Sequence, residues 1–142
     1  LLNNTDIYSS VITKNKLIII VCDNGGFAVI NRLQLFKGGK EFNNLLKSSK
    51  TPGLVDVDFA KHAESMGAKS EHVTSISDLE EAFHRAKKSD VTYVISIKTH
   101  AYKWVEGSAF WDSPTLEIPS TKENKEALII HKDGKSKQRQ GI

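Results

Sequence analysis

An apolar run that ends in a polar turn constrains the fold of this chain more than any other stretch. Residues 17–22 are all apolar and mostly β-branched, and the chain continues as Asp23-Asn24-Gly25-Gly26. Such a run predicts a strand buried on both faces, as in a parallel sheet that helices cover. The two glycines predict a turn with permissive backbone angles directly after that strand.

The chemistry of this turn admits two interpretations. Ligands bind at the carboxyl ends of strands in open parallel sheets, and an amide beside two side-chain-free peptides could hold a hard cation or a phosphate there. A plain strand-to-helix turn would have the same sequence, since Asn-Gly turns are common. A short helix is expected over 27–34, and its first N–H groups would favour an anion at the same edge.

The rest of the sequence alternates between helix and strand patterns. This order indicates an α/β fold with an open, mostly parallel sheet and helices on both faces. Residues 36–53 are expected to form a long polar loop that packs through its few apolar side chains. The expected elements are helices over 5–13, 27–34, 56–66 and 77–88, strands over 17–22, 68–73 and 91–97, and a final helix or strand over 120–133.

Capping residues are expected to delimit the helices. A side-chain oxygen before a helix accepts a hydrogen bond from its first turn, and a Ser/Glu pair three residues apart forms a capping box. Glycine is favoured just after a helix end. The candidates are Asn4 or Thr5, Asp56 or Asp58, the Ser77–Glu80 pair, and Gly67 as a terminator.

Length and composition fit a globular chain of ordinary make-up. The 142 residues are 39% apolar and 26% charged, which allows one sizeable core. We expect an α/β domain over residues 1–119 and a C-terminal helix and basic tail over 120–142, disordered from 134. Cys22 is expected to be a small core residue, and a lone cysteine favours a reducing, cytoplasmic location.

Several functional classes are not expected. No apolar run approaches the roughly 18 residues of a membrane span, and the start does not resemble a signal peptide. The net charge of +3 is concentrated in 120–142 without interleaved aromatic residues, so a solvated tail is expected rather than a nucleic-acid surface. The five histidines lack metal-pair spacing, and no Gly-Lys-Ser/Thr phosphate loop is present.

The sequence over 23–34 resembles the second half of the thiamine diphosphate motif, which runs from Gly-Asp-Gly to an acid/amide pair. Its form, Gly-Phe followed by Ile-Asn-Arg-Leu-Gln, is similar to the family of thiamine-diphosphate-dependent hydrolases that open trihydroxycyclohexane-1,2-dione in inositol catabolism. The resemblance covers nearly the whole chain. Further similar blocks lie at 57–60, 65–68, 79–82, 91–95, 110–114 and 137–141.

The resemblance implies a C-terminal diphosphate-binding domain that uses thiamine diphosphate and Mg²⁺. Asn24 matches a side-chain metal ligand, and Gly26 matches the position that offers a backbone carbonyl. Both are hard oxygen donors of the kind that Mg²⁺ requires. The cofactor-binding residues implied by the resemblance are Asn24, Gly25, Gly26, Phe27 and Ala28.

The resemblance also implies parts that lie outside this sequence. The Gly-Asp-Gly segment, with the second metal ligand and the first strand, is expected upstream of Leu1. A partner subunit is expected to supply the pyrimidine-binding domain with its activating glutamate. No catalytic residue is therefore assigned in this chain, which alone is expected to be inactive. The expected active form is a homo-oligomer acting on a small cyclic diketone.

Alternatives remain open within this resemblance. Acetolactate synthases and decarboxylases of the same superfamily share the fold and the metal motif. A non-catalytic module that only associates with a partner is the second class. Arg32, Gln34 and Trp111 are weaker candidates for shaping a substrate site.

Overall fold

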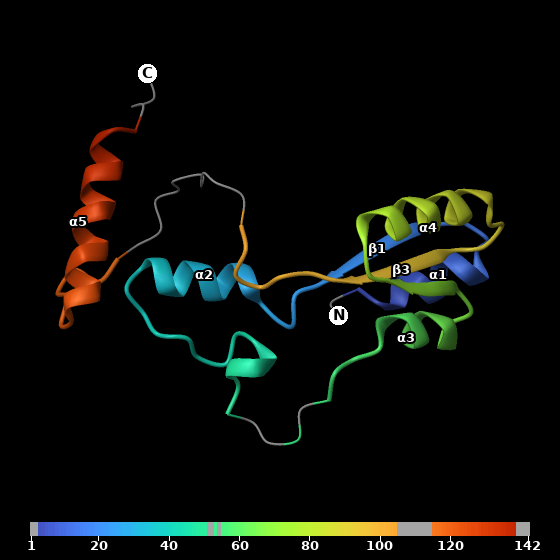
Figure 1. Cartoon of the computed structure of the whole chain (residues 1–142), viewed down its shortest axis with the longest axis horizontal. Coiled ribbons are helices and arrows are strands. Elements are labelled where there is room, and N and C mark those ends of the chain that lie inside the picture. Colours follow the sequence, from blue (N-terminus) through green and yellow to red (C-terminus); the bar gives the residue numbers. More distant parts are fainter. Residues whose placement is uncertain (1–2, 51–52, 54, 105–114, 139–142) are drawn as a thin grey trace. The chain divides into compact units, whose positions relative to one another are not determined.

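A computed structural model describes residues 3–50, 53, 55–104 and 115–138 (Figure 1). The chain forms two compact units. Unit 1 comprises residues 1–24 and 53–100, and unit 2 comprises residues 25–52 and 101–142. The expected division after residue 119 remains a prediction.

Unit 1 is a three-stranded parallel sheet with helices on both faces, as expected from the sequence. The strand order is β1-β3-β2, so β3 is central and pairs in parallel with both neighbours. The elements of unit 1 are α1 (Thr5–Ile12), β1 (Ile18–Asp23), α3 (Phe59–Ser65), β2 (Lys69–Val73), α4 (Ile76–Lys88) and β3 (Tyr93–Lys98).

The central strand β3 fills two hydrophobic layers. Ile95 and Ile97 pack with Ala82 of α4. Val94 packs on the opposite face with Ala63 of α3 and with α1. Successive side chains of a strand point to opposite faces, so one strand contributes to both layers. Figure 1 shows α4 on one side of the sheet and α1 and α3 on the other.

The strand β1 lies at an edge of this sheet and one of its faces is partly exposed, which corrects the expectation that it is buried on both faces. Ile20 is 42% exposed. Cys22 is exposed and is not the core residue that the sequence predicts. Within the described part of the chain, β1 pairs only with β3. The apolar run thus indicates a strand correctly but not its place in the sheet.

The helix ends of unit 1 follow the expected signals with two corrections. Asp58 caps α3 by accepting a first-turn N–H at 3.0 Å, and Gly67 follows that helix with a φ of +86°. The helix α4 begins earlier than predicted, because Ser75 accepts the Asp78 N–H at 3.1 Å and Ser77 is already helical. The candidate caps before α1 make no side-chain cap.

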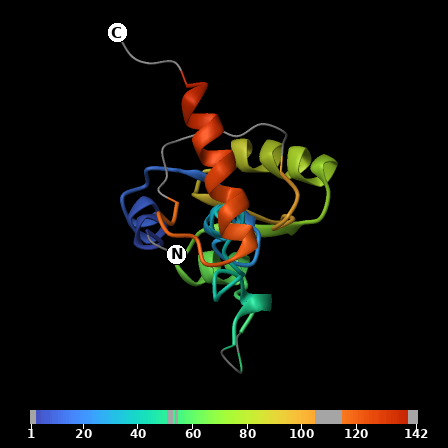
Figure 2. The ribbon, with the colours of Figure 1, turned by 90° about the vertical axis from the view of Figure 1, so that its left-hand side faces the viewer.

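The described residues of unit 2 form two helices and one short 3-10 helix. They are α2 (Ala28–Phe36), η1 (Leu46–Ser48) and α5 (Lys122–Ser136). Leu45 is 3% exposed, but the other apolar side chains of the predicted loop are 40–61% exposed, namely Phe36, Phe42 and Leu46. The prediction that the loop packs through its apolar side chains is therefore correct for Leu45 only. Figure 2 shows α5 as one uninterrupted helix, so disorder from residue 134 is a wrong prediction for 134–136. Among the described residues, no helix is long and apolar enough to cross a membrane.

Candidate functional site

The glycine turn after β1 has the backbone conformation that its sequence predicts. The strand ends at Asp23, and Asn24 leads into two glycines. Gly25 and Gly26 have φ angles of +76° and +150°, a region that residues with side chains rarely adopt. The helix α2 then begins at Ala28. A parallel strand therefore connects to a helix start through a tight, side-chain-poor turn.

Residues 44–46 hold one side of this turn within unit 2. The N–H of Phe27 donates to the Asn44 carbonyl at 2.7 Å, and the N–H of Leu46 donates to the Gly25 carbonyl at 2.9 Å. A Cβ at Gly26 would collide with the Asn44 backbone, whereas a Cβ at Gly25 would meet nothing within 4 Å. One side of the turn is packed, and the Gly25 side is open.

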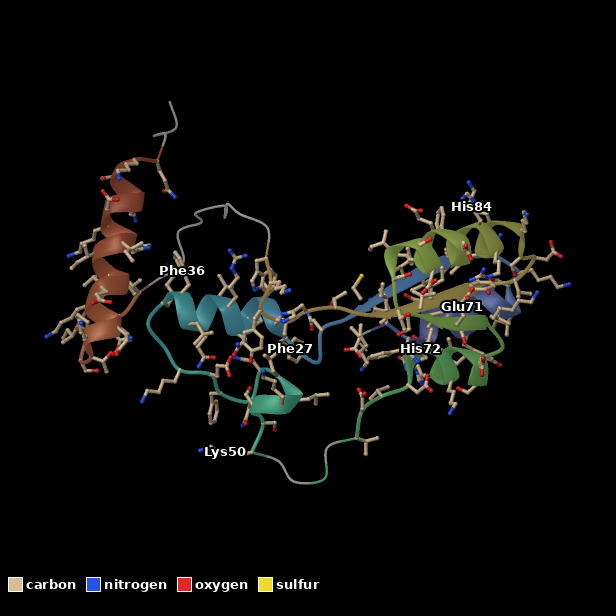
Figure 3. The ribbon with its side chains drawn as sticks, viewed as in Figure 1. Phe27, Phe36, Lys50, Glu71, His72 and His84 are labelled. Atoms are coloured by element: carbon tan, nitrogen blue, oxygen red, sulfur yellow. The ribbon has the colours of Figure 1, made fainter. Side chains whose placement is uncertain are left out.

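The first turn of α2 carries no side-chain cap. Phe27 occupies the N-cap position, with φ −93° and ψ 64°. Its apolar side chain is 68% exposed, while the next residue, Ala28, is buried. Figure 3 labels Phe27 at the start of α2 and Phe36 at its other end. Because unpaired N–H groups at a helix N-terminus carry partial positive charge, this arrangement favours an anion.

Three charged side chains meet at the carboxyl edge of the sheet in unit 1. Asp23 and Lys98 end neighbouring strands in register, and Lys98 Nζ lies 2.6 Å from Asp23 Oδ2. The Asp56 carboxylate lies 2.9 Å and 3.0 Å from the same nitrogen. Hydrogen bonds to Asp23 and then to Asp56 raise the pKa of Lys98. Lys98 thereby holds the nearly buried carboxylate that precedes Asn24, while the three side chains together keep a net negative charge.

Sequence reasoning missed this ion-pair cluster. It predicts that Asp56 or Asp58 caps α3, and only Asp58 does so. Asp56 pairs with Lys98 instead. The available signal is that the parallel strands β1 and β3 end in opposite charges, Asp23 and Lys98, which becomes informative once the register is known.

A second polar network lies in unit 2 around Glu41. Asn31 is 2% exposed and donates from Nδ2 to Glu41 Oε1 at 2.9 Å. The hydrogen bond from Asn31 lowers the pKa of Glu41, and one from Tyr102 lowers it further. Lys47 Nζ lies 4.4 Å from the centroid of the Tyr102 ring. Glu41 therefore stays ionised and ties Tyr102 to α2.

The predicted cofactor-binding residues are contiguous in the chain. Asn24 is the last residue of the first segment of unit 1, and residues 25–28 open unit 2. Among the described residues, no group of three or more His, Cys, Asp or Glu side chains is placed to hold a metal ion. Any metal bound here would need oxygen donors such as the Asn24 amide and the turn's backbone carbonyls.

The three weaker candidates for a substrate site lie in different surroundings. The Arg32 guanidinium lies 4.9 Å from the centroid of the Trp104 ring. The Gln34 side-chain amide is held at both ends, because Nε2 donates to a loop carbonyl at 2.6 Å and Oε1 accepts from Asn44 at 2.5 Å. Trp111 lies outside the described residues.

A comparison with known protein families decides the relationship of this chain. The family described as thiamine pyrophosphate enzyme, C-terminal TPP binding domain, matches residues 1–97. The chain belongs to this family. The matched region includes β1, the glycine turn and α2, as well as the whole sheet up to residue 97.

Curated relatives within this thiamine pyrophosphate family confirm the resemblance inferred from the sequence. The chain is 33% identical over 114 residues to 3D-(3,5/4)-trihydroxycyclohexane-1,2-dione hydrolase from Bacillus anthracis, covering 76% of the chain and 18% of the relative. It is 30% identical over 138 residues to the hydrolase of the same name from Geobacillus thermodenitrificans, covering 93% and 22%. The chain spans about a fifth of the length of these relatives.

A solved thiamine-diphosphate enzyme shares the fold. The thiamine diphosphate-dependent 4-hydroxybenzoylformate decarboxylase of Rhodococcus jostii RHA1 matches with a TM-score of 0.53 and 25% identity. The match covers 68% of this chain and 17% of that chain. This likeness confirms the open, parallel α/β architecture of the thiamine diphosphate-binding fold.

Proposed function

We propose that this chain is the diphosphate-binding part of a thiamine-diphosphate-dependent hydrolase that opens trihydroxycyclohexane-1,2-dione in myo-inositol catabolism. The observation that carries the proposal is the turn over 24–26, which joins the carboxyl end of β1 to the uncapped start of α2. The dione hydrolases among the relatives support this cyclic 1,2-diketone as the substrate. We propose a cytoplasmic location for the enzyme.

We assign Mg²⁺ to oxygen donors of this turn. Asn24 would supply its side-chain carbonyl and Gly26 its backbone carbonyl, both hard ligands that suit Mg²⁺. The open space at Gly25 supports the fit, as does the lack of a side-chain cap on α2. Gly25 and Ala28 would then offer backbone N–H groups to the diphosphate. The Phe27 N–H donates to the Asn44 carbonyl, so Phe27 would contribute through its position at the start of α2.

The part of this chain in the reaction is to bind and orient. When bound, thiamine diphosphate supplies the nucleophilic carbon for C–C cleavage. Lys98 pairs with Asp23 and holds that carboxylate at the end of β1, next to the proposed ligand Asn24. Arg32, Gln34 and Trp111 are the weaker candidates for shaping the substrate site.

The proposed site is one half of a complete one. The family resemblance assigns the second metal ligand to a Gly-Asp-Gly segment, and the activating glutamate to the pyrimidine-binding domain of a partner subunit. We assign no catalytic residue to this chain and propose that the active enzyme is a homo-oligomer.

An NMR titration of the 142-residue chain tests the metal and diphosphate assignment. With Mg²⁺ present, thiamine diphosphate should shift the amide signals of residues 24–28 with millimolar affinity, because half of the ligand set is missing. Asn24→Leu should abolish these shifts. Asn3→Leu, the same change at an exposed asparagine before α1, should leave them intact. Micromolar affinity, or no shift at saturating cofactor, would contradict the half-site assignment.

The substrate is tested in a chimera. The segment of the Bacillus anthracis hydrolase that matches this chain is replaced by this chain, and consumption of the cyclic dione is measured. Turnover that depends on Asn24 is expected. Acetolactate formation or decarboxylation of a 2-oxo acid in place of dione opening would favour the alternative enzymes, toward which the structural match to a decarboxylase points. A chimera that binds cofactor without any turnover would favour a non-catalytic module.

A further inference from the structure

We propose that a pocket on α2, within unit 2, binds a small planar carboxylate. The pocket has a volume of about 370 Å³, and its lining includes Arg32, Leu35, Phe36, Tyr102 and Trp104. This volume falls in the range of small-molecule sites, about 300–1,000 Å³. The pocket shares Arg32 with the candidates for shaping the substrate site, but it contains none of the residues assigned to Mg²⁺ or diphosphate. The proposal therefore does not rest on the cofactor assignment.

Arg32 carries a charge that no side chain in the described ranges neutralises. Its guanidinium lies 4.9 Å from the Trp104 ring centroid, and no carboxylate of the described residues pairs with it. Arg85 in unit 1 is different, because two hydrogen bonds of 3.1 Å and 2.7 Å tie it to Glu71. A guanidinium stacked on an aromatic ring is held in orientation. Its N–H fork then matches a carboxylate in geometry and charge.

The walls of the pocket favour a flat ligand body. Leu35, Phe36 and Trp104 are 42%, 48% and 38% exposed, although all three are large apolar side chains. Aromatic rings stack readily against planar groups and bury a large area in doing so. A planar ring with a carboxylate at its edge would cover these walls and pair with Arg32 at the same time.

Asn31 adds a hydrogen-bond acceptor to the same pocket. It lines the pocket and is 2% exposed. Its Nδ2 is bound to Glu41, whereas its Oδ1 has no hydrogen-bond partner in the described part of the chain. Buried acceptors are rarely left unpaired. A ring hydroxyl on the ligand would supply the missing donor, so the favoured class is a hydroxylated planar carboxylate.

Titration of the 142-residue chain without Mg²⁺ or thiamine diphosphate tests this proposal. The probes are benzoate, its neutral analogue benzamide, and 3-hydroxybenzoate, followed by NMR and by tryptophan fluorescence. Benzoate should shift signals of α2 and residues 101–104 saturably and bind about tenfold more tightly than benzamide, because a hydrogen bond to a charged group is lost in the neutral probe. The hydroxyl of 3-hydroxybenzoate should strengthen binding further.

Matched variants distinguish binding in the pocket from a general effect of positive charge on benzoate affinity. Arg32→Gln should weaken benzoate binding about tenfold or more and remove the preference over benzamide. Lys50→Gln removes the same charge from an exposed residue of unit 2 beyond η1 (Figure 3) and should bind as the parent does. Arg32→Lys, which keeps the charge without the planar fork, should fall between them.

Defined outcomes overturn the proposal. These are no saturable shift, equal affinity for benzoate and benzamide, unchanged binding in Arg32→Gln, or an equal loss in Lys50→Gln. Far-UV circular dichroism checks that the variants are folded. If Arg32→Gln does not fold, the comparison of the two probes on the parent chain and on Arg32→Lys decides. Because cofactor is absent throughout, failure here leaves the Mg²⁺ assignment standing, and the reverse also holds.

Discussion

The two units of this chain are stabilised in different ways. In unit 1, the central strand β3 places Val94 and Ile95 at 1% and 0% exposure between two layers of helices. In unit 2, the buried apolar side chains among the described residues are only Ala28, Leu45 and Ala127. Unit 1 therefore has a conventional hydrophobic core, whereas unit 2 relies more on backbone geometry and polar contacts.

The contacts of unit 2 show what replaces a large core. Asn124 of α5 donates to the Gly38 carbonyl at 2.9 Å, and Gly38 has a φ of +78° with the Glu123 carbonyl 2.6 Å from the place of its missing Cβ. Gly26 packs against the backbone of Asn44 in the same way. Glycine thus allows close backbone approach at two places. The comparison predicts that truncating buried apolar side chains destabilises unit 1 most. It also predicts that substituting glycines destabilises unit 2 most.

Truncation of Ile95 should have the largest effect. Ile95→Ala leaves a cavity in a fully buried site and should lower the free energy of unfolding by about 2–5 kcal/mol. Urea denaturation followed by far-UV circular dichroism measures this change. Ile129→Ala on α5, where the side chain is 67% exposed, is the control and should cost less than about 0.5 kcal/mol.

A fluorescence probe tests whether the units are independent. In a Trp111→Phe background, Trp104 reports on unit 2 alone. If Ile95→Ala shifts the Trp104 transition as much as the circular dichroism transition, the two units unfold together. That result would contradict the view that the two units are stabilised separately.

Substitution of the turn glycines should cause the second-largest loss of stability, and this loss should fall on unit 2. Gly26→Ala forces an unfavourable φ and a collision with the Asn44 backbone, at a cost of about 1–3 kcal/mol. Gly25→Ala is the matched control, because its φ is also positive but its surroundings are open, and it should cost about 1 kcal/mol. Hydrogen exchange of the Phe27 and Leu46 amides measures the difference. Equal loss of protection in both variants would contradict the packing role of Gly26.

The fold was accessible from the sequence because its signals are local. Alternating helix and strand patterns predict the parallel α/β sheet, and the Asp58 cap and Gly67 are correct. The position of a strand in the sheet is not a local property. The run over 17–22 is apolar throughout, yet β1 is an edge strand, because β3 pairs on both sides and β1 on one within the described residues.

The candidate site also has one part that local sequence signals predict and one part that they do not. The turn over 24–26 is recognisable because its residues are consecutive and glycine has a specific backbone role. The pairing of Asp23 with Lys98 depends on strand register, and the stacking of Arg32 on Trp104 joins residues far apart in the sequence. Neither contact follows from periodicity or spacing, so the structure was needed to find both.

Removal of the Lys98 charge should lower the free energy of unfolding of unit 1 by a moderate amount. Lys98→Met leaves the Asp23 carboxylate, whose side chain is 9% exposed, without this partner. The expected loss is about 1–2 kcal/mol, kept small because Lys98 is itself 57% exposed. Lys61→Met is the control, since its ion pair with Asp58 is 3.7 Å long and exposed, and it should change stability by less than about 0.5 kcal/mol.

The pH dependence of this loss has a defined sign. The pKa of Lys98 is raised above its ordinary value of 10.5, so the folded state binds this proton more tightly than the unfolded state. The stabilisation is fully present below the unfolded pKa and is lost as the pH rises through the folded pKa. The stability difference between the parent chain and Lys98→Met should therefore be constant at neutral pH and shrink above pH 10.5. A difference that stays unchanged from neutral pH to well above pH 10.5 would contradict the assigned pairing.

The start of α4 should give the smallest effect and the sharpest comparison between sequence and structure. The Ser77–Glu80 pattern predicts a capping box, whereas the structure places the cap at Ser75. Ser75→Ala should cost about 1 kcal/mol, because the Asp78 N–H loses its acceptor. Ser77→Ala lies within the helix and should cost less than about 0.5 kcal/mol. Thermal denaturation of both variants measures the difference. If Ser77→Ala costs more, α4 begins in solution where the sequence pattern predicts.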